Sequence, residues 1–499
     1  MEMQFDKIPM TYLQKLAGQL HTQEQTLEVR LPEGMPDIGH VLGAWGQMIV
    51  RGKEWNADHA AVACGVMAWV LYVPEDEEGV RSVEAWLPFS MKWDLPDTRH
   101  DGKIRMTGLV KSVDARSTSA RKLLVRASLD AMADAWLTAQ AEIPAPGELP
   151  SDIQIRQATY PVLLPKEVGE KTFLLEDSLS LPAGSSKAEK LMYYTLQPEI
   201  LEQKVMAGKV VFRGNGLLHV LYRTDDGSLC TADFDIPFSQ YADLEGTYDQ
   251  DASVSVYPCV TSLDVMLDEN GELQVKAGLL GQYLLCDRTE VTVTEDLYSP
   301  HRTATPVTET LQLPAVLDQT EQKLHAEQTV QADARQLVDV SFYPAYGQTE
   351  RVDDGVEVTA SGYFQMLYYD PENTLCSMIS PWQGRRSMAA APESVLSTRI
   401  FPAGRPQGVP GVETVTLRAD VQADTVTAAG QGIVAVTGAQ LGEMEKPDPA
   451  RPALILCRKG TWSLWDIAKK TGTTVDKILQ ANRLETEPEE DAILLIPVS

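Results

Sequence analysis

The sequence predicts a mainly β protein, built from tandem β-sandwich or barrel-like repeats of about 150 residues and a small C-terminal α+β module. Three observations support this fold class. A strand–turn–strand motif recurs, the segments around it keep their spacing, and proline-rich segments divide the chain between the copies. Because internal repetition is a stronger guide to a fold than local propensity, each element is interpreted against the repeat.

The recurring motif is an apolar strand that ends in Leu-Tyr, an acidic turn, and a second strand that ends in Pro-Phe-Ser. It reads VLYVPEDEEGVRSVEAWLPFS at 70–90 and VLYRTDDGSLCTADFDIPFS at 220–239. A weaker copy, MLYYDPENTLCSMISPWQ at 366–383, keeps Leu-Tyr but ends in Pro-Trp-Gln. Glycine after an acidic residue in the first two turns suits a tight connection between antiparallel strands. The motif therefore predicts a β-hairpin in each repeat.

The segments around the hairpin keep their distances in the first two copies. A Leu-Pro pair precedes the motif tyrosine by 40 residues, from Pro32 to Tyr72 and from Pro182 to Tyr222. A later apolar strand follows that tyrosine by 53 residues in both copies. The third copy keeps the same order with different spacing. Its later strand, VTLRADVQAD at 415–424, alternates apolar and polar residues, which predicts a strand with one buried face.

Proline-rich segments mark the predicted domain boundaries. IPAPGELP at 143–150 and EMEKPDPARP at 443–452 favour extended connections, and SPHRTATP at 299–306 separates the second and third repeats. The predicted domains are a first repeat at 1–142, a second at 151–298, a third at 305–442 and a C-terminal module at 453–499.

The C-terminal module has the sequence signals of a strand, two short helices and a closing strand. The segment 453–457 is apolar, and Ser463 is expected to cap the first helix. Gly472 stands where a helix C-terminus favours glycine, and Thr473 is expected to start the second helix. A closing strand is expected at 493–497.

This module resembles a LysM domain. GTWSLWDIAKKTGTTVDKILQAN is similar to the family's Gly-Asp-Thr-Leu-Trp-x-Ile-Ala, Gly-Thr-Thr and Ala-Asn segments, and LLIP is similar to its closing strand. The resemblance implies binding of N-acetylglucosamine-containing glycans by the loop before the first helix and the loop after the second. Both loops differ here, because the first has an extra residue, and the second is acidic and lacks the family's Pro-Gly.

We expect the partner-binding residues of the module to lie on and beside these loops. Because Leu464, Ile467 and Ala468 already supply the core face of the first helix, at least one nearby tryptophan should reach the surface. The predicted partner-binding residues are Trp462, Ser463, Trp465, Asn482 and Arg483.

A LysM module after repeated β-units resembles spore-coat assembly proteins of clostridial type, which carry tandem SPOCS domains (spore coat assembly) and one LysM domain. VLYRTDDGSLCTADFDIPFSQ and EGMPDIGHVLG are similar to the most recognisable SPOCS segments. The resemblance implies a non-catalytic scaffold, forming an extended platform in the mother-cell cytoplasm at the forespore surface. Its implied partner is the coat basement-layer ATPase (stage IV sporulation protein A), bound through LysM, with other coat proteins as further partners. The alternative is a peptidoglycan- or N-acetylglucosamine-binding cell-wall protein, which the LysM resemblance alone would suggest.

Other functional classes have little support in the sequence. A net charge of −28 argues against non-specific binding to nucleic acid. We expect no signal peptide and no transmembrane segment, since no apolar run is long enough. The six cysteines and seven histidines show no ligand or catalytic spacing, so no enzyme activity, cofactor or metal is expected. His219 is interpreted as a core or edge histidine in preference to a catalytic one.

Overall fold

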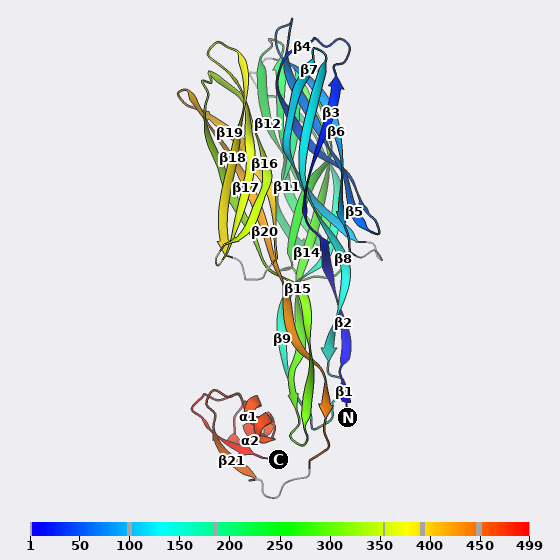
Figure 1. Ribbon diagram of the computed structural model, residues 1–499, viewed down its shortest axis with the longest axis vertical. Coiled ribbons are helices and arrows are strands. Elements are labelled where there is room, and N and C mark those ends of the chain that lie inside the picture. Colours follow the sequence, from blue (N-terminus) through cyan, green and yellow to red (C-terminus); the bar gives the residue numbers. More distant parts are fainter. Residues whose placement is uncertain are drawn as a thin grey trace.

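The computed structural model describes residues 2–96, 102–182, 187–352, 355–389, 395–445 and 452–498. Strands β1–β20 form a broad head and a narrow stalk, and a small module of two strands and two helices lies at the foot of the stalk (Figure 1). The predicted mainly β fold with a C-terminal α+β module is confirmed. Within the predicted linker 443–452, residues 446–451 lie outside the described part of the chain.

Unit 1 (β1–β8) contains two antiparallel sheets. Strands β4, β5 and β6 form a meander, in which β5–β6 is the first predicted hairpin. In the second sheet β8 lies in the middle, with β7 on one edge and both β2 and β3 on the other. The bounds are Glu2–Gln4 (β1), Asp6–Ala17 (β2), Leu20–Arg30 (β3), Ile38–Trp55 (β4), His59–Pro74 (β5), Arg81–Asp94 (β6), Lys103–Ser119 (β7) and Lys122–Ala145 (β8).

Units 2 (β9–β14) and 3 (β15–β20) repeat this plan, with one long strand in place of β2 and β3. Their meanders are β10-β11-β12 and β16-β17-β18, and their second sheets have the orders β13-β14-β9 and β19-β20-β15. The bounds in unit 2 are Gln154–Ser180 (β9), Ala188–Met206 (β10), Lys209–Thr224 (β11), Leu229–Asp243 (β12), Ser253–Leu267 (β13) and Glu272–Tyr298 (β14). Those in unit 3 are Ala304–Gln331 (β15), Gln336–Val352 (β16), Gly355–Tyr369 (β17), Leu375–Ala389 (β18), Val395–Pro410 (β19) and Thr414–Leu441 (β20).

The three hairpin turns differ in the residue that adopts a left-handed backbone conformation. Gly79 and Gly227 have φ angles of 88° and 87°. In the third turn Asn373 takes this role, with a φ of 64°. Asparagine tolerates the left-handed region better than most residues with a side chain. The third copy therefore forms its hairpin without glycine.

The stalk consists of three ribbons, β2–β8, β9–β14 and β15–β20, whose ends extend beyond the head (Figure 1). The strands of the second and third ribbons are 27 or 28 residues long, so each continues from the head into the stalk. β1 pairs with β20, so unit 3 holds the start of unit 1. Apolar side chains from all three ribbons meet inside the stalk: Ile143, Val162, Leu164, Val291, Val293, Leu311, Leu313 and Ile433.

In the head the three units close a ring. The first meander strand of each unit packs against a neighbour, with β4 on β13, β10 on β19 and β16 on β7. The leucine of each repeated Leu-Tyr pair lies in a core that the units share, since Leu71, Leu221 and Leu367 are fully buried in one cluster. Each unit thus needs its neighbours to cover its apolar surface. The repeats surround one axis, which corrects the expectation of an extended platform.

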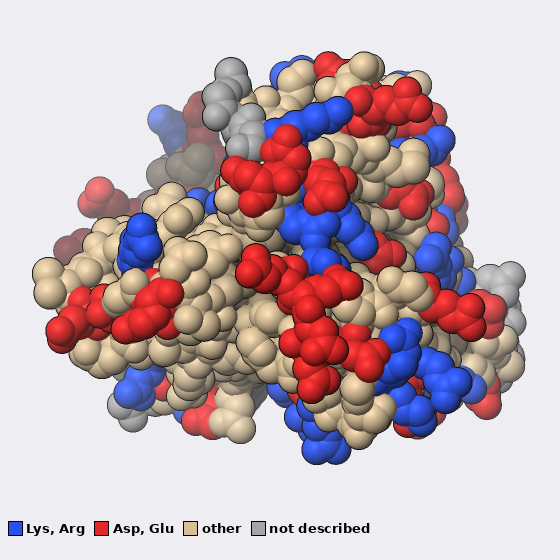
Figure 2. Space-filling view, turned by 90° about the horizontal axis from the view of Figure 1, so that it is seen from above, with Lys and Arg blue, Asp and Glu red and all other residues tan. Residues whose placement is uncertain are grey.

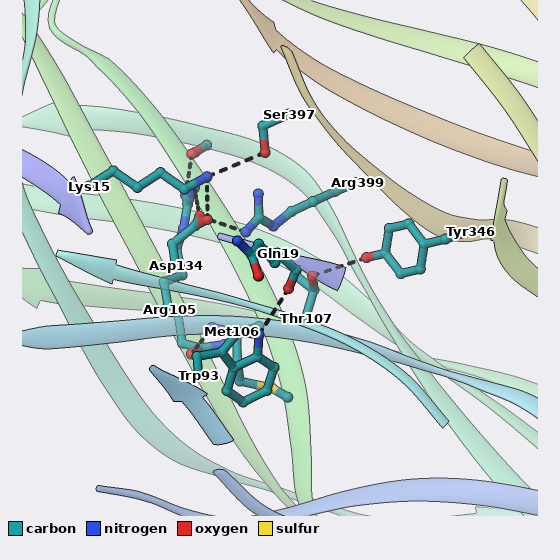
Figure 3. Close-up of polar contacts among 12 residues, drawn as sticks. Lys15, Gln19, Trp93, Arg105, Met106, Thr107, Asp134, Tyr346, Ser397 and Arg399 are labelled. Carbon is teal, nitrogen blue, oxygen red and sulfur yellow. Dashed lines mark hydrogen bonds and ion pairs between the residues drawn. The ribbon is translucent and has the colours of Figure 1, made fainter. Parts of the chain in front are cut away.

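Charged residues are buried where the three units meet (Figure 3). We call them the Asp134 cluster, which consists of Lys15, Arg105, Asp134 and Arg399. Asp134 Oδ1 lies 2.6 Å from Lys15 Nζ. Asp134 Oδ2 lies 3.3 Å from Arg105 Nη2 and 2.5 Å from Arg399 Nη2. Unit 1 supplies the carboxylate and two cations, and unit 3 supplies the third cation.

Unit 2 supplies further partners for the two guanidinium groups. The centre of the Tyr257 ring lies 4.4 Å from Arg105 Cζ and 5.2 Å from Arg399 Cζ. Arg105 Nη1 donates a hydrogen bond to Ser255 Oγ at 2.7 Å. Burial alone would raise the pKa of Asp134, but the cations of Arg399, Lys15 and Arg105 hold it well below its usual range. The carboxylate is therefore ionised, and its charge joins residues from opposite sides of the ring.

A break between β2 and β3 allows Lys15 to reach Asp134. The pairing of β2 with β8 shifts between Lys15 and Ala17, and the Lys15 side chain then passes over Gly18. A Cβ atom at position 18 would stand 2.1 Å from Lys15 Cε and 2.5 Å from its Nζ. A side chain there would require the flexible end of Lys15 to move, so glycine leaves room for the ammonium group beside the carboxylate.

Acidic and basic side chains are interspersed over the end of the head (Figure 2). In unit 1, Arg126 Nε lies 2.9 Å from Asp114 Oδ2, and Arg121 Nη1 lies 2.7 Å from Asp37 Oδ1. Nucleic-acid binding proteins usually gather their basic residues on one face or stripe. On this end of the head, the described basic residues do not gather in this way.

Replacing the central carboxylate should destabilise the whole head. Asp134→Leu would leave the buried Arg105 and Arg399 and the half-buried Lys15 without their acid, which should lower the free energy of unfolding by about 3–5 kcal/mol. Glu327→Leu is the matched control, because Glu327 and its partner Arg418 are both more than half exposed. Urea denaturation of both variants checks this expectation. Equal losses would show that the cluster does not hold the units together.

Stability should also depend on pH through Asp424. This residue of β20 is 5% exposed; its burial, together with the charge of Glu321, raises its pKa from 3.8 to about 6. In this pH interval the native state binds more protons than the unfolded state, so stability should fall as pH rises from about 4 to about 6. Asp424→Asn should remove about 2–3 kcal/mol of this fall. Denaturation at several pH values, with Asp333→Asn at an exposed position as the control, measures the difference; identical pH profiles of Asp424→Asn and the unmodified protein would contradict it.

Candidate functional site

The C-terminal module has the predicted order of strand, helix, helix and strand. Its elements are β21 (Leu454–Arg458), α1 (Leu464–Thr471), α2 (Val475–Asn482) and β22 (Ile493–Pro497). Ser463 caps α1, because its Oγ accepts a hydrogen bond from the Asp466 N–H at 3.1 Å. Gly472 ends α1 in the left-handed conformation, with a φ of 67°. The helix signals in the sequence were therefore sufficient to locate α1.

The start of α2 differs from the prediction by one residue. Thr474, and not Thr473, is the N-cap, and its side chain accepts a hydrogen bond from the Lys477 N–H. Thr473 is fully buried, and its carbonyl accepts a hydrogen bond from the Tyr298 hydroxyl of β14. A contact with the stalk therefore fixes Thr473 one position before the cap.

The resemblance to LysM domains places ligand binding at two loops of the module. These loops are 459–463 and 483–492, and the Gly460 N–H joins them by donating to the Glu490 carbonyl at 2.9 Å. Between them, Glu487 Oε1 lies 3.1 Å from Lys459 Nζ and accepts a hydrogen bond from the Leu464 N–H at 3.3 Å. Leu464 begins α1, so the carboxylate lies at the positive end of the helix dipole. One of the protein's own acids thus occupies a position between the two loops.

Trp462 is the exposed aromatic residue beside these loops. Its side chain is 48% exposed, and Lys470 Nζ lies 4.6 Å from the centre of its ring. The loop after α2 adds the acidic side chains of Glu485, Glu487, Glu489, Glu490 and Asp491. This part of the module therefore combines an exposed aromatic surface with excess negative charge.

Trp465 contacts the stalk. Its indole N–H donates a hydrogen bond to Asp296 Oδ2 at 2.8 Å, and its ring meets that of Tyr298 edge-on, with centroids 4.8 Å apart. Lys469, on the same face of α1, places its Nζ 2.7 Å from Asp296 Oδ1. Burial alone would raise the pKa of Asp296, but Lys469 and Trp465 lower it below its usual value. Helix α1 is therefore bound to the end of β14 through one ionised carboxylate.

The end of β14 is shaped for this contact. Glu295 is an extra residue in the pairing of β14 with β9, which is a β-bulge. Beyond the bulge, Leu297 packs in the stalk core, and Tyr298 packs in the core of the module. The Tyr298 hydroxyl donates to the Thr473 carbonyl at 3.0 Å. Stalk and module thus share a hydrophobic cluster in addition to the ion pair.

The other three predicted residues have different environments. Ser463 acts as a helix cap. Asn482 ties α2 to β22, because its Nδ2 donates to the Leu495 carbonyl and its Oδ1 accepts from the Leu495 N–H, both at 2.7 Å. Arg483 ends α2 with a φ of 55° and is exposed. Trp462 and Arg483 are therefore the two predicted residues that lie free of these internal roles, and their contact with a partner stays a prediction.

His219 lies in the head, in a polar network between units 2 and 3. Its Nδ1 is 2.8 Å from Asp233 Oδ1, and its Nε2 is 3.0 Å from Asp339 Oδ1. The Tyr193 hydroxyl donates a hydrogen bond to Asp339. Burial alone would lower the pKa of His219, but the carboxylates of Asp339 and Asp233 raise it to about 10. An imidazolium that keeps its proton near neutral pH is unsuited to act as a general base.

Removing the acid at the end of β14 should release the module from the stalk. Asp296→Ala deletes the partner of both Trp465 and Lys469, and charge-assisted hydrogen bonds of this kind are worth about 1.5–3 kcal/mol. Small-angle X-ray scattering should then show a wider range of module positions, with the melting temperature of the head unchanged. Glu290→Ala, at an exposed position of the same strand, is the control. Identical scattering from Asp296→Ala and the unmodified protein would show that this ion pair does not fix the module.

Comparison with known families identifies two segments. Residues 187–268, which contain β10–β13, match the model described as SipL, SPOCS domain, and residues 463–487 match the LysM domain. No curated protein matches the chain. Neither helix in the described part of the chain is long and apolar enough to span a membrane. The two matches indicate a sporulation-related protein and confirm the predicted resemblance: the chain carries a SPOCS domain and a C-terminal LysM domain.

Proposed function

We propose that the protein is a non-catalytic scaffold of spore-coat assembly, which binds a protein partner through its LysM module. The observation that carries this proposal is the state of the module's ligand region. Glu487 links the two loops through its ion pair with Lys459 and its hydrogen bond from the Leu464 N–H, and both Glu487 and Trp462 are about half exposed. A surface of this kind suits a protein partner, because interface energy concentrates in a few exposed aromatic residues.

The charge of the module favours a partner with a basic surface. Five acidic residues follow α2; Glu487 pairs with Lys459 and Asp491 with Arg458, and the other three, Glu485, Glu489 and Glu490, are exposed. The SPOCS match supports a role in sporulation, and in that setting we propose the coat basement-layer ATPase, stage IV sporulation protein A, as this partner. The corresponding location is the forespore surface in the mother-cell cytoplasm.

A glycan-binding cell-wall protein is the alternative, and the LysM match favours it. Sugar binding at the two loops would require Glu487 to leave Lys459 and the start of α1. Anionic wall polymers would also meet five like charges on one loop. Saturable retention of the full chain on purified peptidoglycan would support this alternative.

Two substitutions in the module should have different effects on partner binding. Trp462→Ala removes an exposed aromatic residue, so the module should stay folded while affinity for the ATPase falls about thirtyfold, which corresponds to about 2 kcal/mol. Ile467→Asp places a carboxylate in the small core of the module and should unfold it. Gln480→Ala, at an exposed position of α2, is the control.

The measurement is partner affinity, determined beside a thermal melt for each variant. Normal binding by Trp462→Ala would exclude this residue as the contact. If a protein lacking 453–499 still reached the forespore surface, the docking role would belong to the β-units.

A further inference from the structure

A cavity of about 700 Å³ lies beside the Asp134 cluster, between units 1 and 3. Its wall comes from the break between β2 and β3, from β15 and from strands β16, β19 and β20. Leu16, Leu20, Met132, Leu313 and Ile400 give it a largely apolar lining. Cavities of about 300–1,000 Å³ with an apolar lining and a few polar groups are typical of small-molecule sites.

The charge that the cavity presents is positive. Lys15 is the sole Lys, Arg, His, Asp or Glu among those lining residues that the structure describes. Its side chain is 31% exposed, whereas that of Asp134 behind it is 1% exposed. The Ser397 hydroxyl lies 3.4 Å from the Lys15 ammonium. A molecule in the cavity would therefore meet the ammonium group and the hydroxyl, while Asp134 is nearly fully buried. Figure 3 shows the Lys15 nitrogen between Ser397 and Asp134.

The positive charge near this wall is incompletely balanced. Three cations of the Asp134 cluster share one carboxylate. Within the described part of the chain, the Nε atoms of Arg105 and Arg399 have no hydrogen-bond acceptor. Asp424 adds a second acid near the arginines, but it lines a different and smaller pocket. The cluster therefore carries more positive than negative charge, and this excess would attract an anion beside Lys15, the member of the cluster that lines the cavity.

We propose that this cavity binds a small organic anion, with a carboxylate beside Lys15 and Ser397 and an apolar body against Leu16, Leu20 and Ile400. A carboxylate fits better than a phosphate group, because phosphate sites use several backbone N–H groups or an arginine fork. Here a single ammonium group lines the cavity, with the Ser397 hydroxyl beside it. The site is separate from the LysM module, and the proposal holds whichever partner that module binds.

Binding of decanoate to the full-length protein, measured by isothermal titration calorimetry, tests the site. Decanamide has the same chain without the charge. Its affinity should be lower by a factor of about ten or more, since a charge-assisted hydrogen bond is worth about 1.5–3 kcal/mol. Decylamine, with the opposite charge, should not bind. Undetectable binding of decanoate, or equal binding of decanoate and decylamine, would overturn the proposal.

Three variants assign the binding to this cavity. Lys15→Met should lower decanoate affinity by about tenfold or more, whereas Lys111→Met should leave it unchanged. Lys111 is a matched control, since it also lies near a buried acid, Asp130, at 3.5 Å, but outside the cavity. Ala429→Phe fills the cavity without changing its charge and should abolish binding, so the proposal remains testable if Lys15→Met fails to fold. Normal binding by folded Lys15→Met or by Ala429→Phe would refute the assignment.

Discussion

Burying one carboxylate among three cations is favourable only when all four groups arrive together, because each member left alone would be a buried and uncompensated charge. In the head, the four charged groups and the ring that faces them come from three units, so the three units must come together. Asp134 and two of its cations come from unit 1, Arg399 comes from unit 3, and Tyr257 of unit 2 faces both guanidinium groups. The hydrophobic core draws the units together, but apolar packing is tolerant of small shifts. The Asp134 cluster does not tolerate such shifts, because its ion pairs depend on short distances, so it defines the relative position of the units.

The Asp134 cluster also explains why the three repeats have different residues near the axis of the ring. Arg105 and Ser255 each lie 33 residues after the tyrosine of their motif, so they occupy equivalent positions in units 1 and 2. Identical residues there would bring like charges together, whereas an arginine can donate to a serine, as Arg105 does at 2.7 Å. Away from the axis, the three motif leucines share one apolar core without conflict. Apolar contacts allow the three units to have the same residue at equivalent positions, whereas the buried charges require different residues there.

The same distinction separates what the sequence could predict from what it could not. The hairpins and the caps of α1 depend on neighbours in the chain, so turn residues, alternation and Ser463 were enough to predict them. The ring depends on pairs such as Asp134 and Arg399, which are 265 residues apart, and a single sequence gives no sign of their contact. The run KLLVRASLDAMADAWL does contain two acidic residues among apolar ones, Asp130 and Asp134, but nothing in it indicates their partners. Trp465 was predicted as a contact residue from its position in the module, but its observed partner, Asp296, lies at the end of a strand that precedes it by a whole repeat.

Attachment of the LysM module to the stalk changes how the protein can use it. A module held by the proline-rich linker alone would sample many orientations, and each binding event would have to restrict them. Tyr298 belongs to the module's core, and Asp296 binds α1, so the module's direction relative to the stalk is set before any partner arrives. Trp465 is used in this attachment, which leaves Trp462 as the aromatic residue that faces outward. The long strands then carry that surface away from the head, because β14 continues from the ring of units to the residue that holds the module.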